Sequence, residues 1–117
     1  MSVRDLREEE SLVLKALLEL APMSSQSFSL EGLRAVDLPD GGMGSIRLVY
    51  GGDVPRRMGR ELVIANYFDE DKVPVLISIN LDEADCLFEI DFWRVDYKPL
   101  KRYPLPGEIQ PRLNDKP

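Results

Sequence analysis

The sequence predicts an α+β domain in which an N-terminal helix, together with a short second helix, packs on an antiparallel meander of four or five strands. Apolar residues recur with a helical period near the N-terminus, and after Leu33 they alternate with polar residues as in strands. The strand-like segments are joined by connections too short for a parallel crossover. A chain of 117 residues is long enough for one such domain.

The segment from about residue 7 to residue 21 has the pattern of a helix with acidic residues in its first turn. Asp5 and Glu8 have the spacing of a capping box, and Pro22 is expected to end the helix. Its polar residues form only a narrow stripe, so the apolar arc is wider than one sheet face normally covers. We therefore expect a second covering element, a short helix over residues 25–32.

The following segments alternate apolar and polar residues and are expected to be strands that pair with their neighbours in the chain. Glycines in the DGGMG run mark a turn between the first two of them. Five of the nine prolines fall within residues 99–117. We therefore expect a domain over residues 1–104 and a proline-rich tail over 105–117 that lies extended or disordered outside the sheet. The expected strands are 34–38, 45–50, 61–68, 75–81 and 87–97.

The last expected strand separates its side chains into two chemically different sets. Strand residues point alternately to opposite faces, so the separation follows from a period of two. One set is apolar and is expected in the core, whereas the other places two carboxylates beside a tryptophan and is expected to form a contact surface. A lone tryptophan also often fills a core, so the helix or the tail could cover it instead. The two sets are Phe88, Ile90 and Phe92, and Glu89, Asp91 and Trp93.

The net charge of −6 argues against nucleic acid and anionic membranes as partners, because both repel an acidic surface, and it favours a basic protein. The opening residues MSVRDLREEE lack the apolar core of a signal peptide, and no apolar run is long enough for a spanning helix. With a single cysteine, Cys86, the composition indicates a cytoplasmic protein. The basic cluster of Arg56, Arg57 and Arg60 is expected to pair with acids of the same chain.

The sequence contains no histidine, which removes the usual general base, the commonest zinc ligand and the Ser-His and Cys-His nucleophile pairs. The acidic turns at 69–71 and 82–85 lack the glycine and distal glutamate of a calcium loop and are expected to be solvated hairpin turns. The glycines of 41–44 are not followed by the Lys-Ser or Lys-Thr of a phosphate loop. We therefore expect no metal, no cofactor and no enzymatic activity.

Three stretches of this chain resemble a family of small bacterial domains of unknown function, over residues 4–104. The last stretch also resembles the C-terminal strand of several small immunity proteins that neutralise bacterial toxins, since its acids alternate with aromatics before Pro99. That likeness carries no catalytic residues and implies a basic toxin as the partner. The three stretches are DGGMGSIRL, RELVIANYFDEDKVPVLISINLDE and LFEIDFWRVDYKPLKRYP.

Three functions are compatible with these features. The first is a non-catalytic protein-binding module of the immunity type that uses Glu89, Asp91 and Trp93, with its acidic charge speeding the capture of a basic partner. The second is a homo-oligomeric structural or assembly module, because a nearly all-round apolar helix and the edges of an open sheet favour self-association. The third, ranked last, is an enzyme that uses Glu89 and Asp91 as paired carboxylates.

Overall fold

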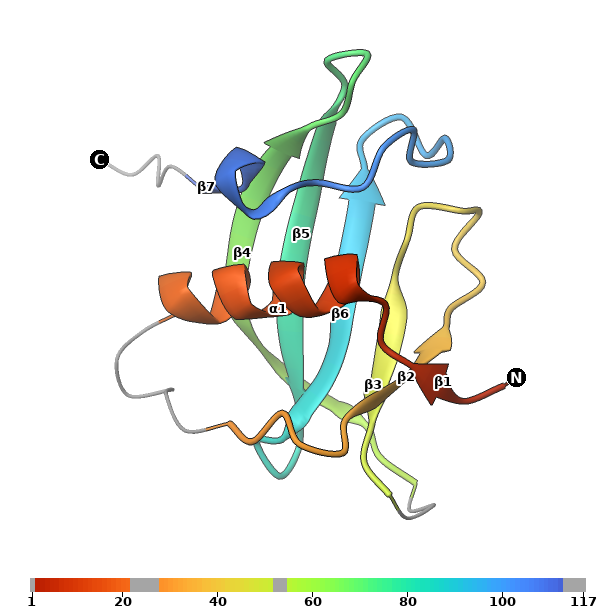
Figure 1. Cartoon of the computed structure of the whole chain (residues 1–117), viewed down its shortest axis with the longest axis vertical. Helices are drawn as coiled ribbons and strands as arrows, with labels where there is room; N and C mark the ends of the chain where they lie inside the picture. Colours follow the sequence, from red (N-terminus) through yellow and green to blue (C-terminus); the bar gives the residue numbers. More distant parts are fainter. Residues whose placement is uncertain (1, 22–27, 52–54, 113–117) are drawn as a thin grey trace.

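A computed structural model describes residues 2–21, 28–51 and 55–112, and within these ranges one α-helix crosses one face of a seven-stranded antiparallel sheet (Figure 1). The α+β class and the antiparallel sheet are confirmed, but four or five strands was too few. The strand order is β1-β2-β3-β6-β5-β4-β7. The elements are β1 Arg4–Asp5, α1 Glu8–Leu20, β2 Arg34–Asp37, β3 Ile46–Val49, β4 Met58–Phe68, β5 Pro74–Asp82, β6 Leu87–Arg94, the 3-10 helix η2 Pro106–Glu108 and β7 Gln110–Pro111.

The predicted meander is wrong at one connection, because β3 pairs with β6 and not with β4. The chain leaves β3 and enters β4 on the far side of β5, three strand spacings away, or about 14 Å. The segment between Val49 and Met58 can span about 30 Å when extended, so it reaches easily. Arg56 fixes this crossing by donating hydrogen bonds to the carbonyl oxygens of Leu48 and Leu87, which belong to the strands being crossed.

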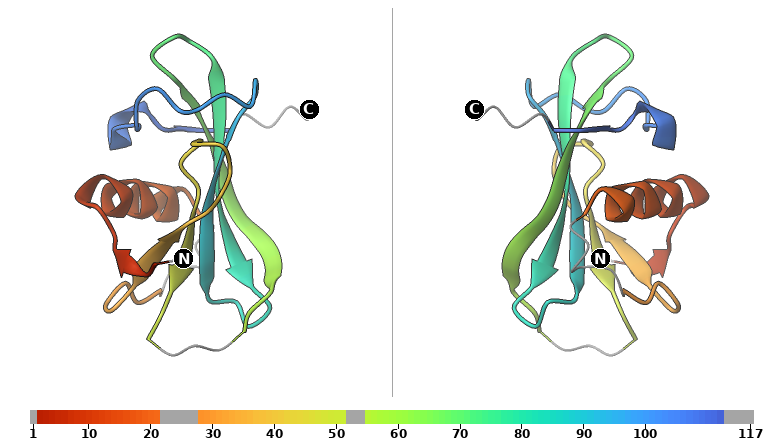
Figure 2. Two further views of the ribbon diagram at one scale, coloured as in Figure 1. Left: turned by 90° about the vertical axis from the view of Figure 1, so that its right-hand side faces the viewer. Right: turned by 90° about the vertical axis from the view of Figure 1, so that its left-hand side faces the viewer.

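The core lies between α1 and the sheet face beneath it. Val13, Leu14 and Leu17 are fully buried on this side of the helix, which crosses β4, β5 and β6 (Figure 1). Both α1 and η2 lie on the same side of the sheet (Figure 2). Within the described ranges no helix has the length and apolar character needed to cross a membrane. The sheet contributes Ala35, Ile46, Leu48, Leu62, Ala65, Tyr67, Val75, Ile77, Ile79, Leu81, Leu87, Ile90 and Phe92.

The helix begins close to the predicted residue 7, but its capping box is formed by Arg7 and Glu10, two residues later than the predicted pair of Asp5 and Glu8. Arg7 is the N-cap, and its backbone N–H donates to the carboxylate of Glu10 at 2.8 Å. The two terminal nitrogens of Arg4 donate to the same carboxylate, each at 2.8 Å, so β1 is tied to the helix start. Glu10 is buried, and this pairing with cations and an amide outweighs burial and holds its pKa below the ordinary value.

The expected second helix is absent from residues 28–32, and the remainder of that prediction, residues 25–27, lies outside the described residues. The outer surface of α1 is therefore less covered than predicted, with Leu12 41% and Leu20 38% exposed. The tail prediction is also wrong for the part described. Residues 110–111 form β7 and extend the sheet by pairing with β4, which a proline can do because β7 is an edge strand.

A buried arginine joins three segments at one end of the sheet. All five N–H groups of Arg94 donate to carboxylates, those of Asp69, Asp71 and Asp96, at 2.6–3.0 Å. Asp69 also accepts hydrogen bonds from the backbone amides of residues 101–102, which fixes the chain beyond β6. The turn at 69–71 is therefore structural and not the solvated turn predicted. Its arginine partner lowers the pKa of Asp71 to about 2.

The helix packing can be tested by comparing two leucines of α1. Leu17→Ala removes a fully buried side chain and should lower the free energy of unfolding by about 2–5 kcal/mol. Leu20→Ala makes the same chemical change at an exposed position and should lower it by less than about 1 kcal/mol. Urea denaturation followed by circular dichroism measures both values. Equal losses would show that α1 does not use this face against the sheet.

Candidate protein-binding site

The sheet side that faces away from α1, here called the outer face, carries the three residues singled out in the sequence. Residues directly opposite each other in neighbouring strands project to the same side, so the strand register assigns each face. Ile90 and Phe92 pair with core residues, which confirms that the intervening positions point outward. No described helix lies on this side of the sheet (Figure 2). The outward pairs are Glu89 with Asn80 and Arg47, Asp91 with Ser78, and Trp93 with Leu76.

Phe88 departs from the predicted alternation. The register between β5 and β6 shifts after Asn80, so that Leu87 and not Phe88 opposes Leu81 in the core. Phe88 is buried, but two guanidinium groups face its ring: that of Arg47 lies 4.0 Å and that of Arg56 5.2 Å from the ring centroid. Phe88 is therefore buried as expected, but because of this bulge it packs against Arg47 and Arg56 and not in the cluster that contains Ile90 and Phe92.

Trp93 belongs to an exposed apolar area at one end of the outer face. Its side chain is 38% exposed and lies against Tyr97, with ring centroids 6.1 Å apart. Phe68 and Val95 flank the same end of the sheet, since Phe68 opposes Pro74 and the amide of Val95 donates to the carbonyl of Pro74. We define the outer-face patch as Phe68, Leu76, Trp93, Val95 and Tyr97. Four of these five side chains are exposed, and Leu76 is half-buried.

Trp93 is the one member of this patch that was predicted from the sequence as a contact residue. Phe68 is the last residue of β4, Val95 follows the end of β6, and Tyr97 lies in a turn with a φ of 64°. Phe68 comes close to Trp93 because β4, β5 and β6 are neighbours in the sheet, an order that the predicted meander also has. The sequence feature that could have identified the other members is the presence of aromatic residues at or just beyond the ends of the expected strands.

Glu89 is held by neighbours on both adjacent strands. The side-chain amide of Asn80 donates to one carboxylate oxygen at 3.0 Å, and a terminal nitrogen of Arg47 reaches the other at 3.4 Å. Its side chain is 15% exposed. Glu89 is thus part of a polar row across the sheet, and its carboxylate is already occupied by partners within the chain.

Asp91 is half-buried on the same face and has a different environment. Its side chain has one hydrogen-bonding neighbour in the described part of the chain, the hydroxyl of Ser45 at 3.4 Å. The carbonyl of Phe92 lies 3.3 Å from that hydroxyl and competes for its single proton. Burial, followed by the charge of Glu89, raises the pKa of Asp91 above its ordinary value. No cation lies within ion-pair distance of Asp91 among the described residues.

The other sequence candidates have structural roles. Asp82 accepts hydrogen bonds from the amides of residues 84 and 86 and from Arg56, so the second acidic turn is also not simply solvated. Arg56 and Arg60 pair with acids of the chain, as expected. Gly41, Gly42 and Gly44 have positive φ angles, which confirms a turn. Among the described residues, no group of three or more histidine, cysteine and acidic side chains is placed to hold a metal ion.

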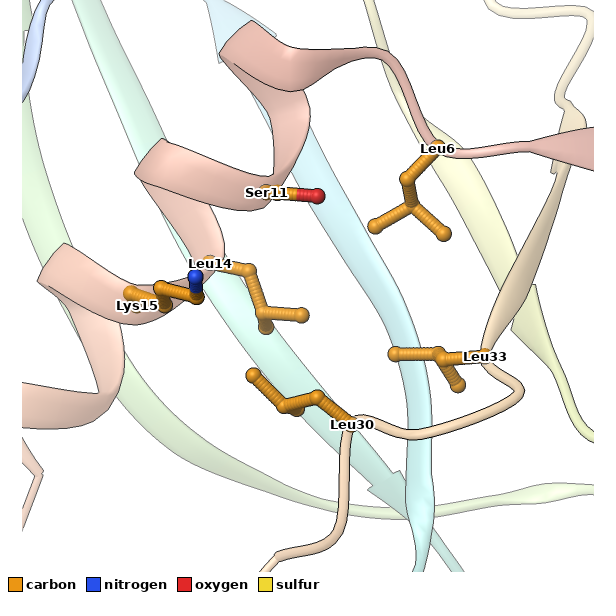
Figure 3. A pocket seen from close by; sticks show the side chains of 6 residues that line it. All are labelled: Leu6, Ser11, Leu14, Lys15, Leu30 and Leu33. Carbon is orange, nitrogen blue, oxygen red and sulfur yellow. The ribbon is translucent and has the colours of Figure 1, made fainter.

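A cavity of about 190 Å³ lies on the opposite side of the sheet, between α1 and the segment that precedes β2 (Figure 3). Its leucines converge from three segments, and the side chains of Ser11 and Lys15 lie at one side of it (Figure 3). It contains none of the residues predicted to form a site. The apolar residues are Leu6, Leu14, Leu30 and Leu33.

Residues 3–104 match the family model described as "Domain of unknown function (DUF6984)". This match supports the resemblance to a family of small domains of unknown function that the sequence suggested over residues 4–104. No curated protein and no solved structure matches the chain.

The two outward carboxylates should respond differently to neutralisation. Glu89→Gln weakens contacts with Arg47 and Asn80 and should lower the free energy of unfolding by roughly 0.5–1.5 kcal/mol. Asp91→Asn removes an unpaired charge and should not destabilise the protein at pH 7. Because folding raises the pKa of Asp91, the wild type loses stability relative to Asp91→Asn as the pH rises above about 3.9, the value of an unperturbed aspartate.

Denaturant titrations at pH 3 and pH 7 measure this difference. The Asp91→Asn variant and the wild type should have similar free energies of unfolding at pH 3, where the carboxyl group is protonated. At pH 7 the variant should be the more stable of the two. A variant that loses stability between pH 3 and pH 7 relative to the wild type would show that Asp91 has a cationic partner within the chain.

Proposed function

The chain belongs to this family of unknown function, and we propose that it is a non-catalytic protein-binding module of the immunity-protein type. The contact area comprises the outer-face patch together with Glu89 and Asp91, which precede Trp93 on the same face of β6. The observation that carries this proposal is the exposure of a tryptophan, a phenylalanine and a tyrosine on one side of the sheet, with no described helix over them. Contiguous exposed aromatic area of this kind favours a role in protein contact.

The proposed partner is a basic protein, in the simplest case a bacterial toxin of the nuclease type. The net charge of −6 would raise the rate of encounter with such a partner and oppose contact with nucleic acid or an anionic membrane. Acidic groups also lie next to the patch. Asp96 lies between Val95 and Tyr97 of the patch, and the Arg94 cluster to which it belongs carries three carboxylates for one guanidinium. A cytoplasmic location accompanies this proposal.

A non-catalytic role agrees with the arrangement of the carboxylates. The sequence has no histidine. The carboxylate of Glu89 is already hydrogen-bonded to Arg47 and Asn80. An enzyme that used Glu89 and Asp91 would need both carboxylates available to a substrate. We therefore retain the enzyme only as the last alternative, and we propose no cofactor.

A homo-oligomeric module is the second candidate, and the exposed side of α1 favours it. Leu12 and Leu20 lie eight residues apart, about two helical turns, and are both exposed. A second copy could cover this stripe. Sedimentation velocity at micromolar concentration tests this candidate. An oligomeric module should sediment as a dimer that Leu12→Glu dissociates. A wild type that sediments as a monomer would contradict this function.

The main proposal is tested by capturing a partner from an extract of the source organism with immobilised wild type and two variants. Trp93→Ala removes the centre of the outer-face patch, and Leu12→Ala is the matched control on the opposite side of the sheet. A specific partner should bind the wild type and the control alike and bind Trp93→Ala at least about ten-fold more weakly. The partner, once purified, should have a basic isoelectric point. A partner retained by Trp93→Ala but lost by Leu12→Ala would place the contact on the helix side.

A further inference from the structure

Asp91 differs from the other carboxylates that are removed from water in the described structure. Glu10, Asp69 and Asp82 are buried, and each accepts hydrogen bonds from an arginine of the chain. Each of these three has a pKa below its ordinary value, because hydrogen bonds from backbone amides and from the arginine together outweigh burial. Asp91 is half-buried and has only the shared hydroxyl of Ser45. A half-buried carboxylate without a cation costs folding free energy that a bound cation would recover.

The charges around Asp91 are of the same sign. Glu89, Asp40 and Glu61 all act on it as negative charges, and they come from β6, from the turn before β3 and from β4. Arg47, which lies opposite Glu89 on this face, is engaged with Glu89 and with the ring of Phe88. The negative potentials of these groups therefore add at Asp91, and a cation brought there would be attracted by all of them.

Trp93 follows Asp91 by two residues and projects to the same face, so the two Cβ atoms are about 7 Å apart. A guanidinium group that donates to a carboxylate has its central carbon about 4 Å from the carboxylate carbon, and a favourable cation–π contact extends to about 6 Å from a ring centroid. One planar cation can therefore satisfy both contacts at this spacing. The indole is 38% exposed and accessible on this side.

We propose that Asp91 and Trp93 form a receptor for one arginine side chain of the partner protein, with the guanidinium donating to Asp91 and lying over the indole of Trp93. This inference rests on the proposed function and names the chemistry of its partner. The arginine is expected to be flanked by apolar residues, because Leu76 and Phe68 continue the outer face beside Trp93.

Arginine is preferred over lysine on physical grounds. A guanidinium is planar, is more weakly hydrated than an ammonium group and can combine two parallel hydrogen bonds to a carboxylate with stacking on an aromatic ring. The chain itself follows this preference, since every ion pair among the described residues uses an arginine.

The test uses three peptide probes, Ac-Leu-Arg-Leu-NH2 and the same peptide with lysine or glutamine at its centre. Each is titrated to roughly 20 mM, a range that detects millimolar dissociation constants. The readout is the NMR signal of the Trp93 indole N–H, which is unambiguous because the chain has one tryptophan. The proteins are the wild type, Asp91→Asn and Glu9→Gln. The last is the matched control, since it neutralises an exposed carboxylate on the helix and changes the net charge equally.

The arginine peptide should shift the indole signal saturably in the wild type and in Glu9→Gln. Its affinity should fall about five-fold or more in Asp91→Asn, and the lysine and glutamine peptides should bind more weakly than the arginine peptide. An arginine peptide that causes no saturable shift, or that binds Asp91→Asn as tightly as the wild type, would overturn the receptor. Equal binding of the lysine peptide would overturn the assignment to arginine. In each of these cases, loss of the captured partner in Trp93→Ala would still support the outer face as the contact area.

Discussion

β6 pairs with β5 over most of its length and with β3 at Glu89 and Ile90, and this pairing fixes the direction of its side chains from Glu89 to Arg94. Because the residues alternate, each core residue of the strand is followed by an outward one. Ile90 and Phe92 join the core under α1, while Asp91 and Trp93 are held on the outer face. The contact area we propose is therefore a direct consequence of the packing that stabilises the domain, and a register shift of one residue would destroy both.

Arginines connect parts of the chain that the sheet alone would leave loose. Arg4 ties β1 to the helix start, Arg56 fixes the crossing from β3 to β4, and Arg94 joins the turn at 69–71 to the chain beyond β6. Such buried charges stabilise only when they are fully paired, and the five donors of Arg94 are all used. Against this pattern an unpaired, half-buried Asp91 is an exception. Residues that depart from the rule followed elsewhere in a protein are frequently functional.

Local patterns in the sequence predicted most of the elements but not their arrangement. The helix and five strands follow from periodicity, and the two faces of β6 follow from alternation. The pairing of β3 with β6 could not be predicted from local patterns, because it and the Arg56 contacts that accompany it join residues far apart in the sequence. β1 and β7 have two residues each, too few to show a period. The bulge at Phe88 has no sequence signal either.

For the candidate site, too, the residues on one strand could be predicted from the sequence, whereas their contacts with other segments could not. Glu89, Asp91 and Trp93 share a face because they lie on one strand, so the sequence was sufficient for them. Tyr97 and Phe68 join Trp93 only through the turn after β6 and through the pairing of β4 with β5. The difference between the two carboxylates also required the structure, since Arg47 and Asn80 come from the neighbouring strands and engage Glu89 alone.

The most direct measurement of this account is an NMR titration of the side-chain carboxyl carbons of the aspartates in the protein without a partner. Asp91 is expected to titrate above the ordinary aspartate value of about 3.9, whereas Asp71, bound to Arg94, is expected to titrate at about 2 in the same experiment. An Asp91 that titrates below the ordinary value would show that a cation or further donors already hold it. The outer face would then have no vacant carboxylate for a partner.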